Sequence, residues 1–372
     1  MEERINFFVG LDAHKDSISI AACEAGREAA RFVGTIGPDV RGLFKILDKA
    51  GEPARVSVVY EAGPTGYGLY RELLRRGYRC EIIAPSLIPK RAGVRIKNDR
   101  RDCIRLAELS RAGELKAIWV PDEAHEAMCN LWRAREDAVG IRLKSRQQLK
   151  AFLLRMNRRY PGKTSWTKSH ERWIAEQRFD HAADRMALAE YQLAVQSAEQ
   201  RVDRLTTALV EATQGWRFEP VVAALRALRG IDTVAAIGLV TEIGDISRFA
   251  TARQLMGYLG LVPSEHSTGN SIQRGSITKT GNSHARRLLT EAAWNYRFPA
   301  RLSPTLKQRS QDLPEAVRNH AWKAQQRLCT RFSRLSSRGV QHNKVCVAVA
   351  RELAGFVWAI AHQAIPAMSA IH

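Results

Sequence analysis

The sequence predicts an α/β domain followed by mostly helical structure, an α/β plus α fold class. Short apolar runs alternate with helical stretches in the first 120 residues, as in domains that pack helices on a sheet. A stretch with few glycines then has apolar residues at a period of about 3.5, and short helices with glycine turns follow. These changes of pattern divide the chain into residues 1–121, 122–214 and 215–372.

Strands dominate the start of the first segment. Residues 7–11 are an apolar run typical of a strand buried on both faces, and residues 17–21 alternate polar and apolar side chains after a tight turn. The other strands are expected at residues 31–35, 56–60 and 80–84. Helices are expected at residues 40–50, at residues 67–76 and from Asp99 onward. Three consecutive strands followed by strand–helix units predict a mixed sheet flanked by helices.

The middle segment predicts a helical coiled coil. Apolar residues of its second long helix recur in alternating steps of three and four: Leu188, Tyr191, Val195, Ala198, Val202, Leu205 and Leu209. This period favours a left-handed coiled coil, either with the preceding helix or with another subunit.

The third segment predicts short helices around a polar loop. Helices are expected at residues 225–230, 233–243 and 251–259, and Thr251 with Gln254 forms a capping box for the last of these. Residues 263–282 are polar and contain glycine, which is typical of a loop. An arginine-rich helical stretch at residues 327–338 and an apolar C-terminal part complete the segment.

The composition favours a nucleic-acid partner, although a merely basic surface is the plainer alternative. The chain has 58 Lys and Arg against 38 Asp and Glu, a formal net charge of +20 and a pI near 10.1. Hydrophobic content of 45% excludes wholesale disorder. The six scattered cysteines indicate reduced thiols, and Arg351 with Glu352 interrupts the most apolar late stretch. With no secretory signal visible, we expect a cytoplasmic, nucleoid-associated protein without a membrane span.

Four acidic residues stand where metal ligands would be expected: Asp12, Glu61, Asp99 and Asp102. Asp12 and Glu61 end predicted strands, and such ends can lie side by side in a mixed sheet. The other two stand three residues apart at a helix start, which puts them on one helix face. Singly, each could be an ordinary turn, cap or surface acid. Together they predict a site for Mg²⁺ or Mn²⁺, because these cations prefer oxygen ligands and support phosphodiester chemistry.

Short motifs around these acids resemble a known family. They are GLDAHK at residues 10–15, YEAG at 60–63, KNDRRD at 97–102 and WVP at 119–121. This set is similar to the RuvC-like DEDD domain of the "one-ten" family of insertion-sequence transposases. IGDI at residues 243–246, YLGLVP at 258–263 and ITKTGN at 277–282 resemble the second domain of that family, most closely in its "eleven-eleven" branch.

The resemblance implies an RNase H/RuvC-like sheet and a DNA recombinase that acts on donor and target duplexes. In this family a structured non-coding guide RNA (a bridge RNA) directs the enzyme, and the four acids bind Mg²⁺. A serine of the second domain attacks the DNA phosphate and forms a covalent protein–DNA intermediate. Family members act as dimers that pair into tetramers, with subunit contacts through the helical middle.

The resemblance also indicates which hydroxyl attacks. The serine of the family lies five residues after the proline and immediately before a glycine, and Thr268 occupies that position here, with Ser267 before it. Position favours Thr268, whereas the less hindered Ser267 is the easier nucleophile. We expect one of the two to attack, with a slight preference for Ser267.

Two groups of basic residues predict nucleic-acid contacts. The first lies on the first long helix and the turn after it, near Tyr160, Trp166 and Trp173, whose rings could stack on unpaired bases. Its members are Arg142, Lys144, Arg146, Lys150, Arg155, Arg158, Arg159 and Lys163. The second group surrounds the hydroxyl-bearing loop: Arg253, Arg274, Lys279, Arg286 and Arg287.

Other classes of function fit less well. A structure-selective RuvC-type endonuclease would use the carboxylates with water as nucleophile. An actin-like ATPase would need a glycine-rich phosphate loop, which the sequence lacks. A non-catalytic RNA-binding scaffold would explain the charge but not the four acids.

Overall fold

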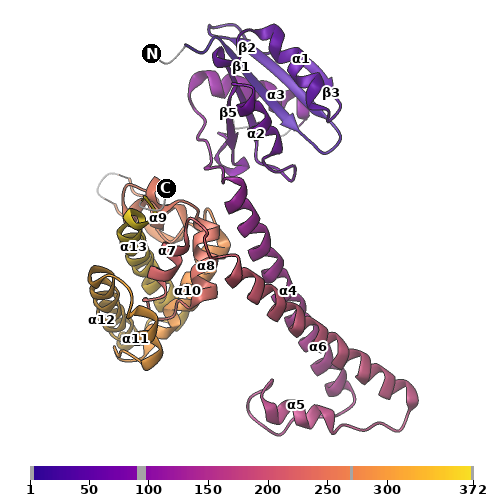
Figure 1. The fold of residues 1–372 in the computed structure, drawn as a ribbon, viewed down its shortest axis with the longest axis vertical. Coiled ribbons are helices and arrows are strands. Elements are labelled where there is room, and N and C mark those ends of the chain that lie inside the picture. Colours follow the sequence, from indigo (N-terminus) through magenta and orange to yellow (C-terminus); the bar gives the residue numbers. More distant parts are fainter. Residues whose placement is uncertain (1–3, 90–97, 269–270, 370–372) are drawn as a thin grey trace. The chain divides into compact units, whose positions relative to one another are not determined.

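The structure, a computed structural model, describes residues 4–89, 98–268 and 271–369 (Figure 1). The chain forms two compact units, Met1–Val120 and Pro121–His372. Lys97 of the KNDRRD motif and Gly269, the glycine that follows Thr268, lie outside the described residues.

The first unit contains a five-stranded mixed sheet in the order β3-β2-β1-β4-β5. The strands are β1 (Phe7–Ala13), β2 (Ile18–Glu24), β3 (Arg31–Ile36), β4 (Val56–Glu61) and β5 (Arg79–Ile83). β1 pairs antiparallel with β2 and parallel with β4, and β4 pairs parallel with β5. The predicted mixed sheet is confirmed.

Helices cover both faces of this sheet (Figure 1). They are α1 (Val40–Ala50), α2 (Gly68–Arg75) and α3 (Asp99–Ala112), with 3₁₀ turns at Pro53–Arg55 and Pro85–Leu87. α1 and α2 bury Phe44 and Leu73 against one face, together with the strand residue Leu11. α3 covers the other face, where Leu106 packs on Val59 and Ile83.

Gly10 allows α3 to pack directly on β1. A Cβ at this position would lie 2.1 Å from the Cys103 carbonyl oxygen and 2.6 Å from the Ala107 amide nitrogen. Both are backbone atoms of α3, so no flexible side chain can move aside to make room.

Gly10→Ala is therefore expected to lower the free energy of unfolding by about 1–3 kcal/mol, the usual cost of overpacking. Gly26→Ala is the matched control, because a Cβ there would meet nothing within 4 Å. Thermal unfolding of the two variants measures the difference. Equal melting temperatures would contradict the close packing of α3 on β1.

A long helical hairpin begins the second unit. It consists of α4 (Glu123–Arg155) and α6 (Ala182–Glu211), with α5 (Lys168–Ala175) in their connection. Leu188 and Val195 of the heptad seam are buried in one cluster with Leu149 and Phe152 of α4. Of the two arrangements that the sequence left open, this seam is filled within one chain.

The remainder of the second unit is a helical bundle around α13 (Figure 1). Its other helices are α7 (Glu219–Leu225), α8 (Thr233–Ile243), α9 (Ala252–Tyr258), α10 (Ser283–Ala293), α11 (Pro304–Ser310) and α12 (Glu315–Ser337), with α13 spanning His342–Ser369. 3₁₀ turns lie at Ile246–Arg248 and Trp294–Arg297. The prediction of a helix at residues 225–230 is wrong. Leu228 lies in a turn that ends at Gly230, whose φ is 84°, and the Leu228 side chain is buried.

α13 is long and apolar enough to cross a membrane over residues His342–Ile365, and half of its most apolar window is buried inside the protein. Val345, Val349, Leu353 and Val357 have no exposed surface. This face of the helix is therefore the centre of the bundle core.

Candidate active site

The sheet register puts Asp12 and Glu61 on the face that α3 covers. Leu11 of β1 pairs with Tyr60 of β4, so the two acids follow the same register position on neighbouring parallel strands. Gly10 and Val59 are register partners that both face α3. Because side chains alternate along a strand, the residues two positions further on also lie on that face.

The first turn of α3 contains the other two acids. The Asn98 side chain caps this helix by accepting a hydrogen bond of 2.9 Å from the Arg101 amide. Asp99 and Asp102 follow in the first turn. The close contact of α3 with Gly10 places this helix start beside the end of β1.

Three ligand atoms meet at this point. Carboxylate oxygens of Asp12 and Asp99 and a ring nitrogen of His14 lie within 4.8 Å of one another. His14 Nε2 is 3.3 Å from Asp12 Oδ1 and 3.7 Å from Asp99 Oδ1. The sequence interpretation missed His14, although this residue lies in the motif around Asp12. The signal that could have found it is the predicted tight turn after the first strand, which places His14 two residues beyond Asp12. In the structure the His14 amide closes this turn by donating a hydrogen bond to the Ser17 carbonyl.

Burial and neighbouring negative charge make the ionised form of Asp12 unfavourable in the absence of a cation. Burial raises the pKa of Asp12 above its ordinary value; His14 lowers it, and the neighbouring Asp99 and Asp102 raise it again. Asp102 Oδ2 is buried and has no hydrogen-bond partner within the described residues. A buried unpaired carboxylate oxygen beside two further acids fits a bound divalent cation.

The hydroxyl-bearing segment forms a hairpin, so the prediction of a loop at residues 263–282 was incomplete. β6 (Pro263–Glu265) pairs antiparallel with β7 (Arg274–Ile277), and Thr268 bridges to Ser271. Ser267 Oγ donates a hydrogen bond of 2.8 Å to Glu265 Oε1. Arg274 Nε lies 3.8 Å from the other oxygen of that carboxylate.

Two glycines hold the base of this hairpin together. Gly260 adopts φ 62°, and a Cβ there would lie 2.5 Å from the Thr280 amide nitrogen. Gly281 adopts φ 67°, and a Cβ there would overlap the Tyr258 carbonyl oxygen. Neither position can accept a side chain, because the two segments touch through their backbones. This contact explains why the YLGLVP and ITKTGN motifs have glycine at these positions.

Asn282 ties the hairpin to the buried core. Its side chain caps α10 by accepting a hydrogen bond from the Ala285 amide, and its Nδ2 donates to Glu242 Oε2 at 2.6 Å. Glu242 is buried. Asn282, the last residue of the ITKTGN motif, is therefore fixed both by the start of α10 and by Glu242.

Several predicted nucleic-acid contacts also have partners within the protein. Arg146 donates to Glu199 at 3.1 Å and lies over the Trp166 ring, and Arg286 donates to the Leu259 and Thr280 carbonyls at 2.8 Å each. Arg287 pairs with Glu291 and Glu136. Within the described residues, seven of the predicted contacts make no side-chain hydrogen bond or ion pair: Arg142, Lys144, Arg155, Arg159, Lys163, Arg253 and Lys279.

The aromatic residues beside the first basic group pack on one another. Tyr160, Trp166 and Trp173 surround the buried ring of His170, with centroid distances of 4.7, 5.2 and 5.8 Å. Tyr160 and Trp173 also line a pocket of about 310 Å³ together with Lys150 and Arg158. Stacking on bases at this pocket stays a prediction.

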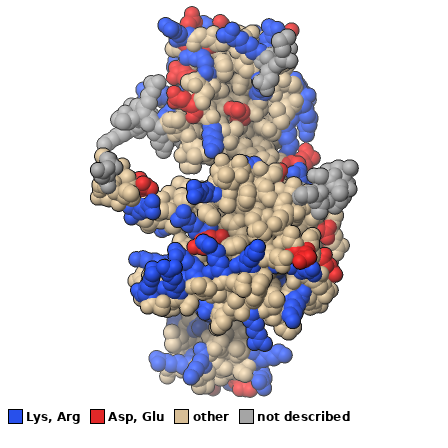
Figure 2. Space-filling model, turned by 90° about the vertical axis from the view of Figure 1, so that its left-hand side faces the viewer, with Lys and Arg blue, Asp and Glu red and all other residues tan. Residues whose placement is uncertain are grey.

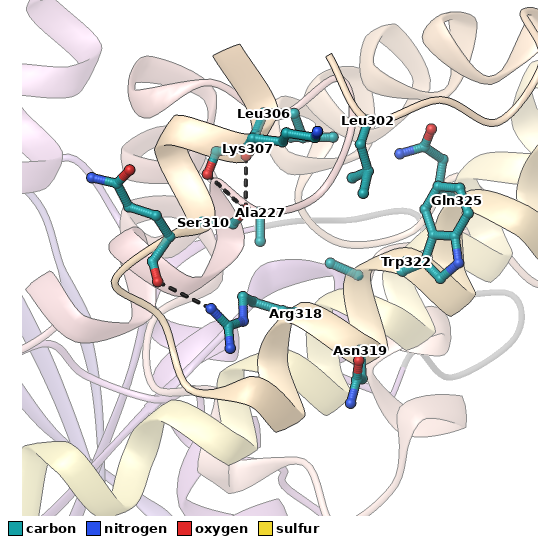
Figure 3. Close-up of a pocket in the computed structure, with 11 residues that line it drawn as sticks. Ala227, Leu302, Leu306, Lys307, Ser310, Arg318, Asn319, Trp322 and Gln325 are labelled. Atoms are coloured by element: carbon teal, nitrogen blue, oxygen red, sulfur yellow. Dashed lines mark hydrogen bonds between the residues drawn. The ribbon is translucent and has the colours of Figure 1, made fainter. Parts of the chain in front are cut away.

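A pocket of about 370 Å³ in the second unit is separate from all of these residues (Figure 3). Leu302, Leu306 and Trp322 form its apolar wall. Its Arg318 donates to the Gln311 carbonyl at 3.1 Å, so this cation is held by the backbone.

Comparisons with known proteins show the family of this chain. A DEDD-type family model described as a transposase matches residues 9–158, and a model described as "Transposase IS116/IS110/IS902 family" matches residues 222–309. "Putative transposase y4qE" of Sinorhizobium fredii (strain NBRC 101917 / NGR234) is 48% identical over 96% of this chain and 89% of the relative. The chain belongs to the IS110 family of transposases. The "Transposase for insertion sequence element IS1533" of Leptospira borgpetersenii is 30% identical over 88% of this chain and 96% of the relative.

Membership of the IS110 family implies recombinase or transposase activity on DNA. It also suggests the use of a divalent metal, for which the cluster of Asp12, His14 and Asp99 offers ligands.

Proposed function

We propose that this IS110-family transposase is an RNA-guided DNA recombinase. It binds a structured guide RNA, cleaves donor and target duplexes and exchanges their strands through a covalent protein–DNA bond. One observation supports this reaction most directly. Carboxylate oxygens of Asp12 and Asp99 lie within 4.8 Å of each other, and Asp102 of the same helix turn has a buried oxygen without a hydrogen-bond partner within the described residues. Glu61 lies on the same face of the sheet.

These four carboxylates are the proposed Mg²⁺ ligands, and Mn²⁺ would suit the same oxygens. His14 is a fifth candidate, or a group that orients Asp12 by its contact at 3.3 Å. When bound, the cations supply charge stabilisation at the phosphodiester and at the oxygens that attack and leave.

Ser267 is the proposed nucleophile, with Thr268 as the alternative. Glu265 Oε1 already accepts the hydrogen bond of the Ser267 hydroxyl and is placed to receive its proton. The bond from Ser267 Oγ to phosphorus forms as the bond from phosphorus to a deoxyribose oxygen breaks, and that oxygen leaves as a hydroxyl after gaining a proton. Strand exchange reverses these steps with a different DNA hydroxyl.

The proposed assembly is a dimer that pairs into a tetramer. The α4–α6 seam is filled within one chain, so the subunit contacts are proposed to involve apolar residues on the outside of the hairpin. Leu143, Met186 and Leu193 have exposed fractions of 58%, 65% and 52%. Charged substitutions in the seam would unfold the hairpin rather than report on assembly.

Protein isolated from cells that contain its whole element is expected to hold one discrete RNA. Ribonuclease treatment should abolish site-specific cleavage, and an added RNA with a changed pairing segment should move the cut to the new complement. Sequencing of the bound RNA and mapping of the cut ends measure both effects. Cleavage at an unchanged site after ribonuclease treatment would contradict RNA guidance and favour a structure-selective nuclease.

A further inference from the structure

Arginines from three helices line two neighbouring pockets in the second unit. Two adjoining depressions, of about 370 and 410 Å³, share Arg327, Arg331 and Glu352 in their walls. We name this feature the arginine groove, and its arginines are Arg253 of α9, Arg327, Arg331 and Arg334 of α12, and Arg351 of α13. Figure 2 views the face of the molecule on which α12 and α13 lie and shows a dense cluster of Lys and Arg there.

Close packing and one carboxylate fix the walls of the arginine groove. Glu352 accepts a hydrogen bond of 2.8 Å from Arg327 Nε, and its second oxygen is 3.2 Å from Arg331 Nε. At Gly355, one turn further along α13, a Cβ would lie 2.9 Å from Met256 Cε of α9. The three helices therefore pack against one another where they present these arginines.

Most of the positive charge in the groove is uncompensated. Five arginines and one glutamate leave a formal charge of +4. Arg253, Arg334 and Arg351 are exposed and make no side-chain hydrogen bond or ion pair within the described residues. On α12, Arg327, Arg331 and Arg334 follow spacings of four and three, so they lie in a row along one helix face.

We propose that the arginine groove binds the phosphodiester backbone of a nucleic acid. All of its cations are arginines, whose planar forks match phosphate oxygens in pairs. Among the described residues that line it, only Met256 and Ala348 are apolar, so the groove offers little area for docking an acidic peptide. The groove positions the nucleic acid without reading its sequence. Arg253, which the sequence interpretation placed around the hydroxyl-bearing hairpin, belongs to this groove.

This binding is independent of the proposed reaction. The groove contains none of the four carboxylates and neither Ser267 nor Thr268. Binding measured in EDTA, without strand cleavage, therefore tests the groove even if the proposed chemistry fails.

The test uses a full-length triple variant, Arg253→Gln, Arg334→Gln and Arg351→Gln, which leaves both partners of Glu352 in place. The matched control removes three exposed cations from one face of α1 by Arg41→Gln, Lys45→Gln and Lys49→Gln. Fluorescence anisotropy measures dissociation constants for a labelled DNA duplex and a labelled RNA hairpin, both of arbitrary sequence, over a series of salt concentrations. Melting temperatures check that both variants stay folded.

The groove variant is expected to weaken binding of at least one probe by about tenfold or more. The slope of log affinity against log salt should fall by about 2 to 3, since three phosphate contacts are lost. The probe that loses more affinity identifies the occupant as DNA or RNA. Losses no larger than those of the α1 control would overturn the proposal. So would an equal loss for labelled polyglutamate, which would assign the groove to acidic protein segments.

Discussion

Asp12→Asn is expected to reduce strand cleavage by about 1000-fold or more, because each tenfold loss reflects only about 1.4 kcal/mol of transition-state stabilisation. Asparagine has nearly the same shape as aspartate but removes a negative charge from the centre of the carboxylate cluster. The ligand atoms of Asp12, His14 and Asp99 lie within 4.8 Å of one another, so the charge is lost from within the proposed metal site. The measurement is the rate of cleavage of a DNA substrate with Mg²⁺ present.

Glu114→Gln is the control for this change, because it removes an exposed carboxylate of the same unit outside the cluster. A second readout separates metal binding from folding. Mg²⁺ should raise the melting temperature of the wild-type protein more than that of an Asp99→Asn/Asp102→Asn variant, since a ligand stabilises only the state that binds it. Equal stabilisation by Mg²⁺, together with unchanged cleavage by Asp12→Asn, would exclude these carboxylates as the metal site.

Removal of both hairpin hydroxyls is expected to abolish the covalent protein–DNA adduct. The variant is Ser267→Ala/Thr268→Val, and cleavage should fall by about 10⁴-fold, as expected when a nucleophile is lost. Ser267→Ala alone should have this effect, because the Ser267 hydroxyl donates to a carboxylate oxygen of Glu265 at 2.8 Å that can receive its proton. Denaturing gel electrophoresis of protein bound to labelled DNA detects the adduct.

Ser276→Ala is the control for the hairpin, since it removes an exposed hydroxyl from β7 without touching Ser267 or Glu265. If Thr268→Val alone removed the adduct, the nucleophile would be Thr268. Cleavage that persists at the wild-type rate in the double variant would show that water is the nucleophile. The protein would then be a RuvC-type nuclease in its chemistry.

The periodicity of the sequence was sufficient to predict most elements of the first unit. The apolar run at residues 7–11 and the alternation at residues 17–21 correspond to β1 and β2, and α1 has the predicted bounds. These elements were predictable because their burial follows the local period of strand or helix. The prediction was wrong at Leu228, where a buried apolar residue belongs to a turn. Burial in a turn leaves no periodic signal.

The sequence predicted that Asp12 and Asp99 share one site, because one ends a strand and the other begins a helix, but it gave no distance between them. His14 was missed because one exposed histidine in a turn has no pattern of its own. The β6–β7 hairpin was also missed, because its strands are short and polar. The sequence also could not predict the hydrogen-bond partners of Arg146 and Arg286, because Glu199 and the Leu259 carbonyl are distant from them in sequence.

The amino-acid sequence alone determined most strands and helices of the first unit, the excess of positive charge and the motifs of the IS110 family, because each of these depends on local pattern or on composition. Tertiary structure decided which groups meet. α3 reaches Asp12 because Gly10 has no side chain to keep it away, and the α4–α6 seam closes within one chain. The arginine groove likewise exists because α9, α12 and α13, which are separated by many residues, pack together around Glu352.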